Sequence, residues 1–441
     1  MKAMFKMKST LTGIQSLRLE DDGGLTIFGL YIFACIAMIS GIAIDMSNLV
    51  AQHTKLQMTA DLAAHAALYN RDSNNASDSI AAALAVVENS MPAAQYGTVI
   101  DANDFIFGDF DYASGDFTPN ADSRNGVLVT ATRYASSLNA VDTFLLGFSG
   151  VPEIDVAAQA LFVTFRPACL REGFVAEDVV DLQSNNGFAN GFCIHSNTHV
   201  SLNSNNNFEE GTVVSMPDLD QLDLPKSGFE SNIGLEVALR RGRMHIRVLG
   251  MIDEIAAGLL DSSSEHIPDY IIDTNVHRHS GKRFDASDFV PGTINHLNCS
   301  SGVTLRNDAG AYSEVVIYSE CKVSLSQGVI FEDVVMFSES TRRDSIKGAS
   351  GIQLGRDDSC DVGGGVQVIS RGGMSFPADL SMDGGQLIAL GEIEFAANAD
   401  GVEGASMISA KWISGTSNMD MAFCGSGMEN NFEAEYFRLA R

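Results

Sequence analysis

The chain has 441 residues, 45% hydrophobic content and a formal net charge of -28 at pH 7. This length is enough for two or three domains with full hydrophobic cores, which excludes disorder as the general state. An acidic surface repels phosphate backbones, so non-specific nucleic-acid binding is excluded, and it favours solubility. The acidic residues are spread along the chain, as is typical of a solvated surface.

The first long feature is a segment without charge, residues 23–44. As a helix it would be about 30 Å long, which matches the hydrocarbon core of a bilayer. Lysine and arginine are more frequent before this segment than directly after it. The positive-inside rule therefore predicts a cytoplasmic N-terminus over residues 1–24, a single transmembrane helix over residues 25–44, and export of the rest.

Cleavage of this segment is the competing interpretation. The apolar run is longer than the core of an ordinary signal peptide and no A-x-A site closes it, so we expect it to be retained. Cys35 lies in mid-span after the bulky Phe33 and Ala34, which makes a poor lipobox. We therefore expect this cysteine to be unmodified.

Residues 45–166 combine helical and strand-like patterns. Apolar and alanine residues at helical spacing predict that the membrane helix continues to Tyr69, and DSIAAALAVVENSM predicts a second helix that ends before Pro92. The segments DFIFGDFDY, GVLVTATRY and EIDVAAQALFVTF are strand-like, with NAVDTFLLGFSG as a short helix before the last of them. We therefore predict a helical and α+β domain whose sheet packs on the preceding helices.

From residue 167 onward, short apolar triplets alternate with Asn, Ser, Gly and Asp. The triplets at residues 366–369 and 387–390 repeat at a spacing near the length of one coil of a parallel β-helix. We predict an all-β extracytoplasmic domain over residues 167–441, in which stacked coils cover one another, with a β-sandwich as the alternative. Asparagines suit its turns because they tolerate left-handed backbone and stack in ladders. The candidates are Asn185, Asn186, Asn197, Asn203, Asn205, Asn206 and Asn207.

One segment with a helical pattern interrupts these apolar triplets and predicts a helical insertion at about residues 232–262. Its sequence is NIGLEVALRRGRMHIRVLGMIDEIAAGLL. Four arginines there form the densest basic patch of the chain, a candidate surface for anionic lipid or an acidic partner. The alternative is a helix that packs on or caps the β-helix, with its arginines in solvent. These residues are Arg240, Arg241, Arg243 and Arg247.

Six cysteines follow the predicted membrane segment, on the side predicted to be oxidising, where structural disulfides are the natural use. No C-x-x-C indicates a zinc ribbon or a redox pair. Other connectivities remain open, but sequence order suggests three bridges. These are Cys169 with Cys193, Cys299 with Cys321, and Cys360 with Cys424.

Catalysis is the second class of function, because parallel β-helices often carry carbohydrate-active enzymes. Such sites need converging carboxylates together with basic groups or Ca²⁺. The candidates are Asp357, Asp358 and Asp361, and separately His277, His279 and Lys282. Neither group forms a recognised catalytic motif, and acidic residues around a Cys and Gly turn are usually exposed loop. His195 and His199 have the spacing of helical metal ligands, but within one strand they would be about 13 Å apart.

Three motifs surround the membrane segment in a fixed order: an acidic pair with Gly, then G-x-A-x-D, then L-Q-x-x-x-D-x-A-A-x-A-A. The matching residues are Asp21, Asp22, Gly23, Gly41, Ala43, Asp45, Leu56, Gln57, Asp61, Ala63, Ala64, Ala66 and Ala67. This stretch, about residues 17–70, resembles the N-terminal segment of TadG-like proteins of the Tad/Flp pilus-assembly family. Weaker similarity in the order of strands and helix extends to Phe165.

The resemblance implies a non-enzymatic, single-pass protein of the bacterial inner membrane with its bulk in the periplasm, which helps to assemble or anchor thin adhesive pili. Expected partners are the membrane and pilus-assembly proteins or pilin subunits, with glycans as a further candidate, and no nucleic acid or cofactor. Many members carry a metal-binding von Willebrand A domain, but its D-x-S-x-S motif is missing here. A β-helical carbohydrate-active enzyme and a surface adhesin remain the alternatives. Gly24-Leu25 would suit prepilin peptidase, but Gly29 stands where pilins usually place Glu.

Overall fold

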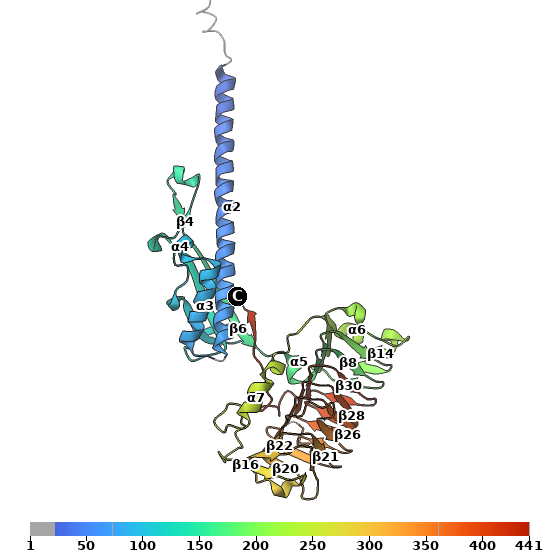
Figure 1. Ribbon diagram of the computed structural model, residues 1–441. Coiled ribbons are helices and arrows are strands. Elements are labelled where there is room, and N and C mark those ends of the chain that lie inside the picture. The colour runs from blue at the N-terminus through green and yellow to red at the C-terminus, as the bar shows by residue number, and fades with distance from the viewer. Residues whose placement is uncertain (1–22, 73, 360, 441) are drawn as a thin grey trace, which may run out of the picture. The chain divides into compact units, whose positions relative to one another are not determined.

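The computed structural model describes residues 23–72, 74–359 and 361–440, which form two compact units (Figure 1). Unit 1 comprises Met1–Phe165 with Tyr436–Arg441, and unit 2 comprises Arg166–Glu435. Unit 2 is therefore inserted between two segments of unit 1. Asp21, Asp22 and Cys360 lie outside the described residues.

Unit 1 is built on one uninterrupted helix, α2 (Gly23–Arg71), drawn in blue in Figure 1. The helix is long and apolar enough to cross a membrane, and the large apolar side chains of its first half are exposed. From Leu56 onward, one face of the same helix is fully buried. That face is mostly alanine, so neighbouring elements pack close to the helix backbone. An exposed apolar half thus continues without a break into a core element.

The buried half of α2 packs on a second helix and on a sheet. α3 (Ala76–Ser90) begins at Asn75, whose side chain accepts the N–H of Asp78 as an N-cap, and α4 (Ala93–Tyr96) follows Pro92. The sheet is antiparallel in the order β2-β1-β3-β6-β32. Its strands are β1 (Phe105–Phe110), β2 (Phe117–Pro119), β3 (Gly126–Arg133), β6 (Val156–Phe165) and β32 (Tyr436–Leu439).

A small hairpin replaces the short helix expected in NAVDTFLLGFSG. Strands β4 (Val141–Asp142) and β5 (Glu153–Ile154) pair antiparallel, and only one 3₁₀ turn, η3 (Leu146–Ser149), lies between them. Gly150 ends this turn with a φ of 90°, a left-handed conformation that glycine adopts without strain. The hairpin runs beside α2 in Figure 1.

Unit 2 contains, within the described residues, a 25-stranded sheet in which every pairing between strands is parallel, unlike the antiparallel sheets of the β-sandwich alternative. Its strands are β7 (Gly173–Ala176), β8 (Val179–Leu182), β9 (Gly187–Phe188), β10 (Cys193–Ser196), β11 (His199–Leu202), β12 (Asn206–Phe208), β13 (Val213–Met216), β14 (Asn232–Ile233), β15 (Leu239–Arg241), β16 (Val276–Ser280), β17 (Arg283–Phe284), β18 (Thr293–Asn298), β19 (Val303–Leu305), β20 (Tyr312–Ser319), β21 (Val323–Leu325), β22 (Ile330–Ser338), β23 (Ile346–Gly348), β24 (Gln353–Leu354), β25 (Val366–Ser370), β26 (Met374–Asp383), β27 (Gly385–Ala389), β28 (Ile393–Glu403), β29 (Ser406–Ser409), β30 (Ile413–Gly415) and β31 (Asp420–Ala422).

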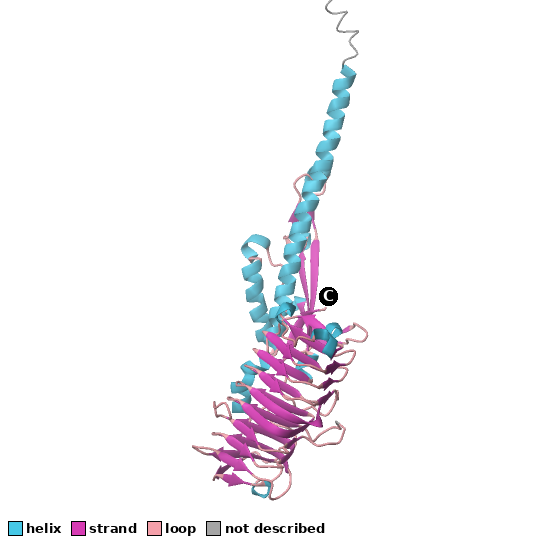
Figure 2. Cartoon of the chain, turned by 90° about the vertical axis from the view of Figure 1, so that its right-hand side faces the viewer, coloured by secondary structure: helices cyan, strands magenta, loops and turns pink. Residues whose placement is uncertain are grey.

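The chain does not enter this sheet at an end. One stack of strands has the order β15-β13-β10-β7-β29-β27-β25-β22-β20-β18-β16. The chain therefore starts at β7 in the middle, builds outward to β15, crosses to the far end over residues 242–275, and builds back from β16 to β29. Figure 2 shows the strands as successive layers.

The register repeats from layer to layer. Gly173 pairs with Cys193, and Cys193 pairs with Val213, so the same shift along the sequence recurs at both steps. The triplets at residues 366–369 and 387–390 also pair with each other, but Val368 lies opposite Leu387, a slightly shorter shift than their spacing in the sequence suggested. Each layer buries its apolar side chains against the next, and the core of unit 2 is continuous from β7 to β31.

Asparagine ladders run along the turns, as the sequence suggested. Asn185, Asn205 and Asn418 all have a φ between 61° and 64°, and their side chains are linked by hydrogen bonds. A second, buried ladder joins Asn186, Asn206 and Asn232 through bonds to backbone N–H groups. These side chains hold neighbouring layers in register, because each one bonds to the layer beside its own.

The expected helical insertion at residues 232–262 is mostly not α-helical. α6 (Leu235–Ala238) and α7 (Ile252–Gly258) have only 4 and 7 residues, and β15 and the 3₁₀ turn η6 (Arg247–Met251) lie between them. Strand β15 pairs with β13, so sheet hydrogen bonds override the helical spacing of the leucines. The end of the chain also differs from expectation, because β32 pairs with β6 in unit 1 and does not extend the β-rich domain.

Candidate functional site

Asp45 is buried on α2, where the exposed apolar half of the helix ends. Its carboxylate accepts backbone N–H groups from Phe144 at 2.6 Å, Leu145 at 2.9 Å and Leu146 at 2.6 Å. The first N–H groups of a helical turn have no partner within it, and the carboxylate supplies one. We call this arrangement of Asp45 and the three N–H groups the Asp45 clamp.

Gly41 lies one turn before Asp45 on the same face of α2, as the G-x-A-x-D spacing requires. A Cβ atom on Gly41 would lie 2.8 Å from Cδ1 of Leu145. Glycine therefore lets the hairpin approach the helix closely, while Ala43 between the two points outward and is exposed. Two of the motif residues thus serve one contact.

The later family residues build the core of unit 1. Leu56, Ala63 and Ala64 are fully buried on the face of α2 that packs on α3 and the sheet. Gln57 donates to the carbonyl of Gln159 at 2.8 Å and to the carboxylate of Asp61 at 2.9 Å. These residues hold the helix to strand β6, and they have no evident chemical role of their own.

In unit 2, the last strands along the chain, β29, β30 and β31, pair with the first strands, β7, β8 and β9. We call this contact the closing joint. Glu172 is buried beside it and accepts the N–H groups of Cys424 at 2.7 Å and Gly425 at 2.5 Å. Burial raises the pKa of Glu172, and the two N–H bonds offset part of that rise. Segments far apart in the sequence are therefore tied by one carboxylate.

A groove of about 560 Å³ lies across the closing joint. Its walls come from three neighbouring layers, and the lining residues are Asp178, Val179, Asp181, Thr198, His199 and Trp412. Burial raises the pKa of Asp181, and repulsion from Asp223 adds to the rise. The groove offers an aromatic ring and two carboxylates, which are groups that bind polar ligands such as sugars or peptides.

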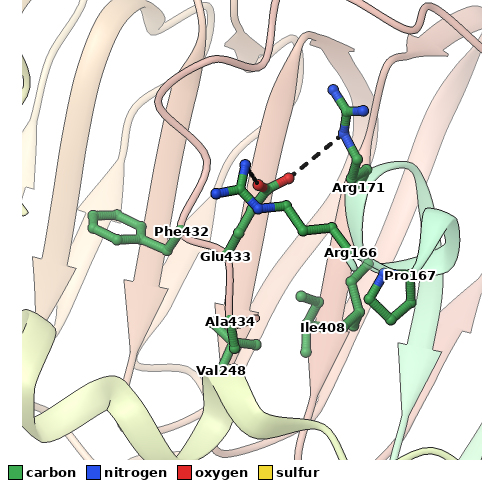
Figure 3. A pocket seen from close by; sticks show the side chains of 9 residues that line it. Arg166, Pro167, Arg171, Val248, Ile408, Phe432, Glu433 and Ala434 are labelled. Atoms are coloured by element: carbon green, nitrogen blue, oxygen red, sulfur yellow. Dashed lines mark ion pairs between the residues drawn. The ribbon is translucent and has the colours of Figure 1, made fainter. Parts of the chain in front are cut away.

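A smaller pocket lies where the chain enters and leaves unit 2 (Figure 3). Glu433 pairs with Arg166 at 2.6 Å and with Arg171 at 3.5 Å, as the dashed lines mark. The free volume is about 10 Å³, room for one water at most, so the pocket is not a ligand site. We call these ion pairs the neck, because they join the segment that enters unit 2 to the segment that leaves it.

The arginine patch predicted from the sequence is not one surface of a helix. Arg240 and Arg241 end strand β15, Arg243 lies in the following loop, and Arg247 lies in a 3₁₀ turn. Arg241 pairs with Asp218 at 3.8 Å, and Arg247 donates to the carbonyl of Glu435 at the neck. At least Arg247 thus has a structural partner within unit 2.

The structure contains the disulfides Cys169–Cys193 and Cys299–Cys321, which confirms two of the three predicted pairs. Cys424 is also disulfide-bonded, whereas its predicted partner Cys360 lies outside the described residues. Cys35 is free. The Cys169–Cys193 bridge joins the entering segment to β10, close to the closing joint.

The carboxylates considered for catalysis lie at a surface turn. Asp358 accepts the N–H of Asp361 at 3.0 Å and lies 3.7 Å from Arg356. Asp357 and Asp361 are exposed. Nearby Asp383 is buried, and its burial together with repulsion from Asp357 raises its pKa to about 6. Neither the groove at Trp412 nor the smaller pocket at Glu433 includes this cluster among its lining residues.

The histidine candidates are separated from one another. His195 lies in β10 and bonds to Ser215 and Asn197, while His199 lies in β11 across a turn, so the two are not on one strand as expected. His277 pairs with Asp273, and His279 bonds to Asn295. Elsewhere Glu254, Glu265 and His266 bring three ligand atoms together, but two of these residues are exposed acids, which commonly cluster without an ion.

Comparison with known protein families supports the division of the chain into unit 1 and unit 2. Residues 23–87 match the Tad family, described as Flp pilus-assembly TadE/G-like, and residues 63–161 match Tad_C, described as Tad-like Flp pilus-assembly. The N-terminal helix and unit 1 are thus those of a TadG-like protein of the Tad family.

A further match covers residues 173–425, more than half of the chain, with the family described as a domain of unknown function, DUF7867. The chain belongs to this family, and the matched region lies within unit 2. Neither a curated protein nor a solved structure matches the chain.

Proposed function

We propose that this chain is a non-enzymatic envelope protein of Tad/Flp pilus assembly, anchored by α2 in the bacterial inner membrane, with residues 45–441 in the periplasm. The observation that carries the proposal is the course of α2 itself. Its first half exposes apolar side chains to the surroundings, and its second half is a core element of a folded unit. Such a helix fixes a folded body at a set distance from a bilayer. Two Tad-family matches support the assignment to pili.

We further infer that unit 2 is a parallel β-helix that presents a rigid binding surface. The all-parallel pairing and the equal register shifts from Gly173 to Cys193 to Val213 support this fold, because each layer can cover its apolar face only by stacking. The groove at Trp412 is the candidate surface for a pilus subunit, a partner protein or a glycan. Its walls are rigid, because the Asn ladders and Glu172 fasten the same layers.

The test measures the piliation of a deletion strain and, separately, photo-crosslinking from the groove to a partner protein. Deletion of the chain should abolish or reduce surface pili, and a photo-crosslinking side chain at Thr198 in the groove should capture a pilin or a pilus-assembly protein in intact cells. The matched control carries the same photo-crosslinker at Ile272, which is exposed elsewhere on unit 2. Normal piliation of the deletion strain would contradict the proposal.

The enzyme alternative has one observation in its favour, the raised pKa of Asp383. A carboxyl group with a pKa of about 6 stays partly protonated in mildly acidic solution, where it can act as a general acid. It lies in a cluster outside the pockets described above, however, and the binding role is the proposal that the geometry supports better.

A further inference from the structure

The hairpin tip of unit 1 exposes large apolar side chains to the surroundings. Phe148 is 89% exposed and Phe144 is 63% exposed, and Leu145 and Val151 beside them are also exposed. Residues 143–152 carry no charge, whereas Asp142 and Glu153 at the base do. An uncharged aromatic tip on a charged base is the pattern of a segment that enters the interface of a membrane.

The Asp45 clamp sets the height of this tip along α2. Three backbone N–H groups of residues 144–146 bond to Asp45, and Leu145 contacts Gly41. Gly41 lies about 27 Å along the helix from Gly23, and the hydrocarbon core of a bilayer is about 30 Å thick. The tip is therefore held beside the last turns of the apolar half, where Ile42 and Ile44 are exposed.

We propose that residues 143–151 insert into the outer leaflet of the bilayer that α2 spans, as a second membrane contact of unit 1. The proposal rests on the membrane anchoring proposed above. The occupant is lipid, because the tip is continuous with the apolar surface of the helix at the same height. Phe144 and Phe148 lie among acyl chains or at their headgroup boundary, and Asp142 and Glu153 remain in water. Unit 1 then has two points of attachment, which fix its tilt and its rotation about α2.

The test uses the fluorescence of a single tryptophan in the full-length chain, reconstituted in phosphatidylcholine vesicles. Trp412 is the only tryptophan, so Phe148→Trp is made in a Trp412→Phe background. We expect blue-shifted emission, with quenching by doxyl-labelled lipid that is strongest for labels near the headgroup boundary. Phe33→Trp within the span is the positive control, and Ile272→Trp, exposed on unit 2, is the negative control.

Each outcome decides a separate claim. Unquenched emission of the Phe148→Trp variant alongside quenched emission of Phe33→Trp would overturn the insertion, whether Phe148 lies in water or is covered by protein in a second copy. Unquenched emission of both would contradict the membrane anchoring itself. Since Phe148 is almost fully exposed, its replacement does not disturb the core of unit 1.

Discussion

The side-chain amide of Asn185 donates a hydrogen bond to the side-chain oxygen of Asn418 at 3.0 Å, across 233 residues of sequence. Asn185 lies in the first layer of unit 2 that the chain builds, and Asn418 lies in the last. The bond therefore crosses the closing joint, where two separately built parts of one sheet meet. A stack that the chain enters in its middle has such a joint between two inner layers, and its integrity depends on contacts between segments far apart in the sequence.

The buried Asn ladder should contribute more to stability than the asparagines beside it. Asn206→Ala removes an acceptor for the N–H of Asn186 and leaves this buried group unpaired. We expect it to lower the free energy of unfolding by about 1–3 kcal/mol. Asn207→Ala is the matched control, because Asn207 is exposed, and we expect a change below about 0.5 kcal/mol. Chemical denaturation of the detergent-solubilised chain measures both, and equal effects would count against the ladder.

The Asp45 clamp should protect specific amides from exchange. Asp45→Asn weakens the charge-assisted bonds to residues 144–146, so we expect these amides to exchange about tenfold faster or more. Hydrogen exchange read by mass spectrometry resolves the hairpin from the sheet.

Asn48→Ala serves as the control for the clamp, since Asn48 reaches the hairpin only through a 3.4 Å contact to the carbonyl of Asp142. It should leave the exchange of residues 144–146 nearly unchanged. If the Asp45→Asn variant exchanges like the parent, the carboxylate does not hold the hairpin.

Asp383 should make stability depend on pH in the acidic range. Its folded pKa of about 6 lies above the unfolded value of 3.8, so the folded state binds the proton more tightly. Its contribution is fully present at and below about pH 4 and is lost as the pH rises through 6. Asp383→Asn should therefore stabilise the chain by about 1–3 kcal/mol at pH 7.5 and have little effect at pH 4. A difference that grows toward low pH would refute the assignment.

Removal of the Cys169–Cys193 bridge should destabilise unit 2. Paired replacement Cys169→Ala with Cys193→Ala is expected to cost about 2–4 kcal/mol, because the bridge closes a loop and fastens the entering segment to β10. Cys35→Ala is the control and should not change the unfolding midpoint in detergent, since this thiol is free. Resistance of unit 2 to protease, with and without reductant, provides the readout. Identical resistance of the bridged and unbridged chains would contradict this role.

Local patterns in the sequence predicted the local elements of the fold. The uncharged run and the alanine spacing predicted α2, and the Asn-rich turns predicted the ladder of Asn185 and Asn205. These features depend on neighbouring residues, whose spacing a sequence displays directly. The helical spacing of residues 235–259 misled for the same reason, because pairing of β15 with β13 interrupts the helical pattern at Leu239.

The contacts between segments far apart in the chain could not be predicted from local sequence patterns. Nothing near Asp45 indicates that its partners are the N–H groups of residues 144–146, far along the chain. Entry into the sheet at β7, the crossing over residues 242–275 and the return of β32 to β6 are also pairings between distant segments. Only the uncharged stretch between Asp142 and Glu153 offered a signal for the hairpin tip, and helical spacing obscured it.

The proposed function requires that α2 is a retained anchor and that residues 45–441 lie outside the cytosol. Protease treatment of intact spheroplasts, followed by non-reducing electrophoresis of the membrane fraction, tests this directly. Without protease, we predict that the full-length chain is in the membrane pellet, resists alkaline extraction and has oxidised Cys169–Cys193 and Cys299–Cys321. With external protease, we predict that unit 2 is lost. A full-length chain in the soluble cytosolic fraction, protected from protease and with its thiols reduced, would contradict it.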